Sequence, residues 1–173
     1  VQILSFSFVI GFGFSIAGAT LVGQHLGAKN TDQAKRAGWG AMRLSIISMT
    51  FFGIIITIFA EPLARFMIDN DEVVRLTVIF IWLLGSMQPL MAIEFSLGGA
   101  LRGAGDTKTP LAITLTCLLF IRVFLAVIFF LLDARIEVIF STLVADYVVK
   151  GFLYVARFKS DKWMSALKSK EAV

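Results

Sequence analysis

Four ionisable residues interrupt the apolar stretches of this 173-residue chain: Glu94, Arg122, Asp146 and Lys150. A charge placed in hydrocarbon costs about 2.5–3.5 kcal/mol on insertion scales, so each of them needs a partner or a function. Asp146 and Lys150 are four residues apart, which puts them on one face of a helix. Two interpretations stay open: a structural ion-pair cluster that joins three helices, or a site where Glu94 or Asp146 exchanges its partner for H+ or Na+.

The elements that must position these residues are long apolar helices. Of all residues, 58% are apolar and 16% are charged, whereas a soluble domain has about 45–50% and 25%. A membrane-crossing helix needs about 20 mostly apolar residues. We therefore predict an all-α, polytopic membrane helical bundle over residues 1–157 with a cytoplasmic basic tail over 158–173. Five transmembrane helices are expected, at about 1–27, 31–60, 73–101, 110–132 and 136–156.

With five such spans, all four ionisable residues lie about 10–18 Å from the same membrane face. Basic residues are concentrated at that face: four in 28–43, two in 102–108 and five in 157–170, against three in the other connections. The positive-inside rule makes this face cytoplasmic. The expected protein is thus multi-pass in the plasma membrane, with the lipid bilayer as partner, its N-terminus outside and its C-terminus cytoplasmic.

The composition excludes several other classes. One cysteine and one histidine leave little material for zinc, thiol or disulfide chemistry. No Ser/His/Asp set with plausible geometry appears, so we expect no enzyme, no catalytic residue, no resident metal and no cofactor. The basic residues stand in short blocks between apolar runs, which indicates membrane topology and no nucleic-acid partner.

Local signals mark helix ends and a break inside the third span. Asn30 and Gln33 are spaced as a capping box, and Pro62 ends or bends the second helix. Pro89 frees the carbonyl of Gly85 from its helical bond, and Gln88 adds an amide at the same depth. Either Gln88 and Pro89 line a cavity for cations or polar ligands, or the helix kinks while Gln88 bonds to a neighbouring helix.

Two pairs of glycines, Gly23 with Gly27 and Gly99 with Gly103, have the G-x-x-x-G spacing. Such small faces predict close helix packing. At the third helix's end, Gly103 and Gly105 favour the left-handed conformation that stops a helix. In the tail, 163–167 (Trp163, Met164, Leu167) predicts either an interfacial stretch on the inner leaflet or a plain solvated tail.

Two stretches of the sequence, residues 22–30 and 101–107, carry a family resemblance. Gln88 and Pro89 lie about fourteen residues before the second stretch. Their motif positions are Gly23, Gln24, Gly27, Ala28, Leu101, Arg102, Gly103, Gly105, Asp106 and Thr107. The chain resembles the MATE (multidrug and toxic compound extrusion) family of secondary transporters. The resemblance implies spans eight to twelve of a twelve-helix transporter, that is, its C-terminal lobe without the first helix. Since the sequence also starts inside a membrane helix, we expect a fragment whose partner is the missing N-terminal lobe of the same polypeptide.

The resemblance further implies an antiporter that exports organic, cationic amphipathic compounds in exchange for H+ or Na+. Glu94 then takes the place of the acid in the family's C-lobe cation site, where any Na+ would bind. Asp146 stays a second candidate from its position in the sequence and not from the resemblance. Arg122 and Lys150 are charge partners that would shift this branch toward protons, and Gln24 joins Gln88 and Pro89 as a cavity or hinge candidate. The alternatives are a lipid or cell-wall-precursor flippase and a truncated, non-transporting helical module.

Overall fold

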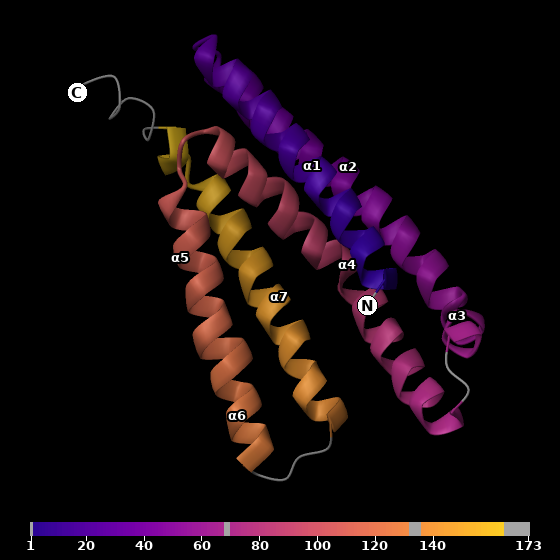
Figure 1. The fold of residues 1–173 in the computed structure, drawn as a ribbon. Helices are drawn as coiled ribbons and strands as arrows, with labels where there is room; N and C mark the ends of the chain where they lie inside the picture. The colour runs from indigo at the N-terminus through magenta and orange to yellow at the C-terminus, as the bar shows by residue number, and fades with distance from the viewer. Residues whose placement is uncertain (1, 68–69, 132–135, 165–173) are drawn as a thin grey trace.

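The computed structural model describes residues 2–67, 70–131 and 136–164, and within them all regular structure is helical. This confirms the predicted all-α helical bundle (Figure 1). The elements are α1 (Gln2–Gly27), α2 (Thr31–Ile58), α3 (Ala60–Met67), α4 (Asp71–Gly103), α5 (Lys108–Thr116), the π-helix η1 (Cys117–Val123), α6 (Phe124–Leu131), α7 (Ile136–Lys159) and the 3-10 turn η2 (Lys162–Met164).

Four helical stretches of the described chain are long and apolar enough to cross a membrane: Ser7–Gly27, Thr31–Ile58, Asp71–Gly103 and Lys108–Phe129. The fifth expected span is α7. Its 24 residues give about 36 Å of helix, enough to cross the hydrocarbon, but it does not stand among those four apolar stretches. The chain is accordingly a multi-pass membrane protein.

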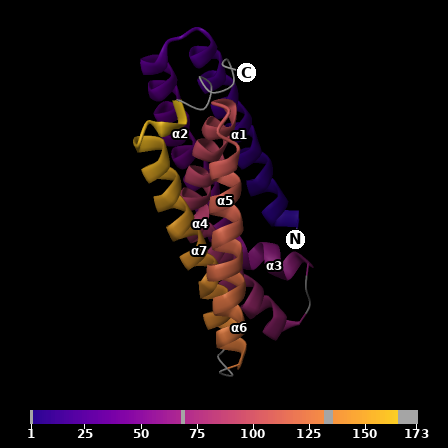
Figure 2. The same ribbon diagram turned by 90° about the vertical axis from the view of Figure 1, so that its left-hand side faces the viewer.

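Helix α4 lies at the centre of the bundle. It packs against α1 and α2 on one side and against α7 on the other (Figure 1). Helix α5, the π-helix η1 and α6 follow one another in a single rod beside α7 (Figure 2). Any residue on the α7 side of α4 is therefore in a position to meet α7 inside the bundle.

The turn between α1 and α2, the turn between α4 and α5, and the end of α7 gather at one end of the bundle (Figure 1). Two ion pairs join these segments. Lys35 Nζ lies 2.7 Å from Asp161 Oδ2, and Arg157 Nη2 lies 2.6 Å from Asp106 Oδ2. The three most basic segments of the sequence thus share one end.

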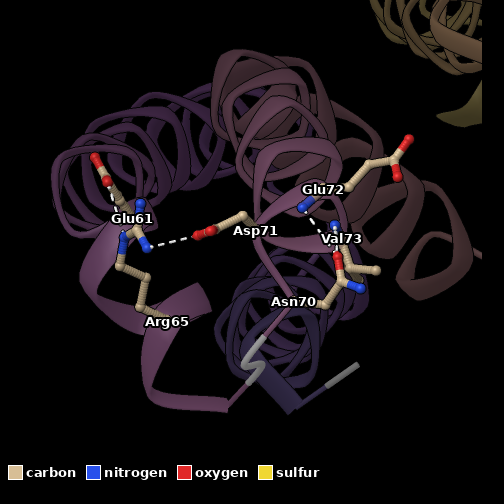
Figure 3. Close-up of polar contacts among 6 residues, drawn as sticks. All are labelled: Glu61, Arg65, Asn70, Asp71, Glu72 and Val73. Atoms are coloured by element: carbon tan, nitrogen blue, oxygen red, sulfur yellow. Dashed lines mark hydrogen bonds and ion pairs between the residues drawn. The ribbon is translucent and has the colours of Figure 1, made fainter.

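Side-chain caps explain where several helices begin. Asn30 Oδ1 accepts a hydrogen bond from the Gln33 amide at 3.1 Å, which is the expected cap at the start of α2. At the start of α4, Asn70 Oδ1 accepts from the amides of Glu72 and Val73 at 3.0 and 3.3 Å (Figure 3). The Asn70 cap lets α4 begin at Asp71, two residues before the expected start.

The expected second span, 31–60, divides in the structure. Helix α2 ends at Ile58, and α3 begins at Ala60 with Pro62 in its first turn, where a missing amide costs no helical hydrogen bond. Arg65 of α3 donates to Glu61 and to Asp71, which fastens the short helix to the start of α4 (Figure 3). Pro62 thus marks the start of a new helix.

The helices α1 and α4 approach closely through small residues. A Cβ placed on Gly99 would overlap the backbone of Ser15, and one on Gly103 would overlap Ala19. This confirms close packing for Gly99 and Gly103. For Gly27 the prediction is wrong, because a Cβ there meets open space.

An apolar cluster fills the end of the bundle where the turns gather. Trp163 of η2 is fully buried in it, stacks on Phe158 with ring centroids 4.7 Å apart, and donates its indole N–H to the Phe158 carbonyl at 2.8 Å. Both interpretations of this segment as surface are therefore wrong for Trp163: the chain turns back after α7 and buries the indole. Leu167 lies outside the described residues.

Candidate functional site

Three of the four ionisable residues meet between α4 and α7. Lys150 Nζ lies 2.8 Å from Asp146 Oδ2 and 3.9 Å from Glu94 Oε1. The side chain of Asp146 is fully buried, that of Lys150 is 6% exposed, and that of Glu94 is 20% exposed. We call these three residues the acid–lysine cluster.

Local sequence explains the arrangement. Asp146 and Lys150 are one turn apart on α7, with the acid N-terminal to the base, which is the favourable orientation on a helix. Tyr147 places its ring 5.3 Å from the Lys150 ammonium, within range of a cation–π contact. Gly151 faces α4, where a Cβ would stand 3.8 Å from Leu90, in ordinary van der Waals contact.

One oxygen of the cluster is not satisfied. Asp146 Oδ1 is buried and has no hydrogen-bond partner among the described residues. A buried carboxylate oxygen without a donor is costly, and such groups concentrate where a ligand, a water molecule or a conformational change supplies the partner. The cluster therefore has capacity for one further hydrogen-bond donor on its Asp146 side.

Arg122 does not join this cluster. It lies in the π-helix η1, its side chain is exposed, and it forms no ion pair with the residues that the structure describes. A π-helix bonds residues five apart, so helical spacing does not predict which way its side chains point. The cluster itself contains two acids and one base.

The structure places the three cavity or hinge candidates, Gln88, Pro89 and Gln24, in three different surroundings. Gln88 is buried and donates from Nε2 to Ser7 Oγ of α1 at 2.8 Å, as in the interpretation where it bonds to a neighbouring helix. Pro89 lies inside the continuous helix α4 and lines a cavity of about 330 Å³ between α2 and α4. Gln24 is exposed at the end of α1. The structure thus brings neither glutamine to the cavity.

The cavity at Pro89 is mostly apolar. Ile54, Ile58 and Trp82 line it together with the hydroxyl residues Thr50 and Thr57. Thr50 Oγ1 is buried without a partner among the described residues. Small-molecule sites have this character, with apolar walls and a few polar groups.

A second hollow, of about 570 Å³, adjoins α3 and the first turns of α4, and Trp82 lines both hollows. Its polar wall includes Glu61, Arg65 and Asp71 (Figure 3). Hydrogen bonds to the two acids raise the pKa of Arg65 above its ordinary value, so the guanidinium in this wall stays positively charged.

At the opposite end, the second motif forms a polar junction. Asp106 Oδ2 accepts from Arg157 Nε and Nη2 at 3.0 and 2.6 Å, and its Oδ1 accepts from the Thr109 amide at 3.2 Å. Burial alone would raise the pKa of Asp106, but the bonds from Arg157 and Thr109 outweigh it and hold that pKa below its usual value. Sequence reasoning missed Arg157 as a partner, because the basic residues of 157–170 predict only which membrane face is cytoplasmic.

The other motif positions have structural roles. Arg102 donates from Nη2 to Ser15 Oγ at 3.0 Å, Gly105 has a φ of 84°, and Leu101 is fully buried. Thr107 precedes α5 without a side-chain capping bond. A Cβ on Gly23 would stand 3.1 Å from the Gly103 carbonyl oxygen, so the two motifs meet where α1 and α4 touch. Ala28 is exposed, like Gln24 and Gly27.

The acid–lysine cluster does not fit a metal ion as it stands. Among the described residues, no three or more His, Cys, Asp or Glu side chains stand together as a metal-binding group. The two carboxylates of the cluster have the Lys150 ammonium between them.

Comparison with known proteins supplies the context for this geometry. The family described as MatE matches residues 1–128, from α1 into α6. A probable multidrug resistance protein NorM of Thermotoga maritima is 33% identical over 172 residues, covering 94% of this chain and 35% of that protein. The NorM of Pasteurella multocida is 29% identical (65% and 24% covered), and Protein DETOXIFICATION 49 of Arabidopsis thaliana is 28% identical (73% and 25% covered). The chain thus spans between 24% and 35% of the length of these relatives.

Proposed function

This chain belongs to the MatE family, and on that premise we propose that it forms part of a secondary active antiporter. The antiporter exports organic, cationic amphipathic compounds in exchange for H+ or Na+. Because the matched relatives are about three times as long, we propose that a facing N-terminal lobe of the same polypeptide supplies the other wall of the pathway.

The acid–lysine cluster is the observation that carries the proposal. It joins α4 and α7, two helices of a membrane bundle, through ionised groups that are costly to keep there. Exchange of a small cation at Glu94 or Asp146 alters the charge balance between the two helices. A ligand that favours one packing over another shifts the population of the two states, which is the requirement for coupled transport.

The cavity at Pro89 supports an amphipathic organic cargo. Its volume of about 330 Å³ lies within the range of small-molecule sites. Trp82 offers an aromatic face to a cation, and the unpartnered Thr50 hydroxyl offers a hydrogen bond. A flippase for an anionic headgroup would need several converging cations, whereas the cluster here pairs one lysine with two acids.

The proposed orientation follows from charge. The basic segments after α1, after α4 and at the end of α7 gather at one end of the bundle (Figure 1), and we propose that this end faces the cytoplasm of a plasma-membrane protein. Cysteine accessibility tests it: a cysteine in place of Lys29 should react with an impermeant reagent only from the cytoplasmic side. Labelling from outside intact cells would reverse the orientation.

Efflux measurements test the transport function. The full-length polypeptide that carries this chain is reconstituted in vesicles, and export of an ethidium-like dye is followed under separate Na+ and pH gradients. One of the gradients should drive efflux, and Glu94→Gln should lower the rate at least tenfold. Glu72→Gln, an exposed acid on the same helix, should have no effect. Efflux that ignores both gradients would end the antiport proposal, and full efflux by Glu94→Gln would end the role of the cluster.

A further inference from the structure

We propose that Lys150 is a tethered counter-cation that closes the acid–lysine cluster to Na+. The inference rests on the proposed antiport and deepens it, because it names a residue that decides which cation the cluster accepts. In this arrangement the place that a diffusible alkali cation would take between Glu94 and Asp146 belongs to the lysine ammonium.

The geometry places the ammonium as a bound cation would be placed. Its Nζ is 2.8 Å from Asp146 Oδ2, the distance of a charge-assisted hydrogen bond, and 3.9 Å from Glu94 Oε1. The aromatic ring of Tyr147 lies 5.3 Å away and adds a third favourable neighbour. Two carboxylates and a ring thus surround one positive charge in a buried position.

A second cation cannot share this place. Ca2+, a hard cation of about the size of Na+, binds carboxylate oxygens at about 2.3–2.6 Å, so Na+ at a similar distance from Asp146 Oδ2 would stand beside the ammonium. Like charges about 4 Å apart repel strongly wherever water is scarce.

Because Lys150 and Asp146 belong to one helix, the exclusion of Na+ persists when the helices move. Asp146 and Lys150 belong to the same helix, one turn apart, so their ion pair survives any movement of α7 relative to α4. Glu94 comes from the other helix and lies at the longer distance. Glu94 is therefore the acid that changes partner when the helices move, whereas Lys150 keeps Asp146 neutralised throughout.

Na+ binding can be measured without transport. The full-length polypeptide, purified in detergent, is unfolded thermally in NaCl and in KCl at equal ionic strength. The wild type should show no stabilisation specific to Na+. Lys150→Gln, which removes the charge and keeps most of the stem, should bind Na+ at least about tenfold more tightly, while Lys150→Arg should behave like the wild type. Lys159→Gln, an exposed lysine at the end of the same helix, is the matched control.

Each outcome decides the matter. A Na+-specific stabilisation of the wild type that Glu94→Gln abolishes would overturn the proposal, even if Lys150→Gln failed to fold. A folded Lys150→Gln protein that remains indifferent to Na+ would also overturn it. In vesicles, Na+-driven efflux that appears only in Lys150→Gln would support it. Loss of efflux under every gradient in the wild type would instead contradict the antiport function and leave the binding measurement to judge Lys150.

Discussion

Replacing Asp106 by alanine should destabilise the bundle by about 3 kcal/mol. Three hydrogen bonds end on this carboxylate, two from Arg157 and one from the Thr109 amide, and a bond to a charged group contributes about 1.5–3 kcal/mol. The contributions do not add, because both Arg157 bonds share one oxygen. Removing one partner of a buried pair costs about 3–5 kcal/mol, and the lower end applies since Arg157 is 26% exposed and regains water.

The matched control is Asp161→Ala. Its ion pair with Lys35 is as short, at 2.7 Å, but the two side chains are 45% and 38% exposed, so its loss should cost less than about 1 kcal/mol. Unfolding in mixed micelles, followed by tryptophan fluorescence, measures both variants. An Asp106→Ala protein within about 0.5 kcal/mol of the wild type, or an equal loss in Asp161→Ala, would refute the reasoning from burial.

The ion pair between Asp106 and Arg157 has a defined pH dependence. The pKa of Asp106 is lowered in the folded protein by Arg157 and Thr109, which outweigh the effect of burial. An acid whose pKa is lower in the folded than in the unfolded protein stabilises the folded state. This contribution is complete above the unfolded-state pKa of about 3.9 and is lost as the pH falls through the folded-state pKa. The difference in stability between wild type and Asp106→Asn should thus be constant from pH 8 to 5 and shrink below about pH 4.

Three further substitutions test the packing. Gly99→Val should cost about 3 kcal/mol, because its side chain would overlap the α1 backbone, whereas Gly13→Val, which points into open space, should not lower the unfolding transition. Gln88→Leu should cost about 1 kcal/mol through the lost bond to Ser7; an unchanged unfolding midpoint would mean that this bond contributes nothing. Trp163→Ala should cost about 3–5 kcal/mol and speed tryptic cleavage after α7, and unaltered cleavage would contradict the role of its indole.

Long apolar runs predict the helices well, because each run exceeds what a soluble helix needs and has a charged or polar connection at its ends. The ends themselves move by two or three residues. Helix α4 extends to Asp71 because Asn70 caps it, and α7 continues to Lys159. The predicted break near Pro62 is present but lies earlier, at Phe59, because Pro62 lies in the first turn of the new helix and not at the junction.

Helical spacing predicts only those contacts of the candidate site that lie within one helix. Asp146 and Lys150 follow from their separation by one turn, and their pair is present at 2.8 Å. The contact with Glu94 depends on how α4 packs on α7, which no single-helix pattern encodes. Arg122 fails to join because the π-helix changes the phase of its span. The partner of Gln88 is one serine among several in the first span, and nothing in the sequence marks it.

The wide turn at Cys117–Val123 has a consequence for how this membrane crossing can vary. A π-helix accommodates an additional residue within a continuous rod, so α5 before it and α6 after it are not held to one angular register. Cys117 stays buried at the start of the turn, while Phe124 and Leu131 beyond it are exposed. Because α7 contacts α5, the π-helix and α6, the two parts of this crossing can each present a different face to α7 although the helical register changes between them.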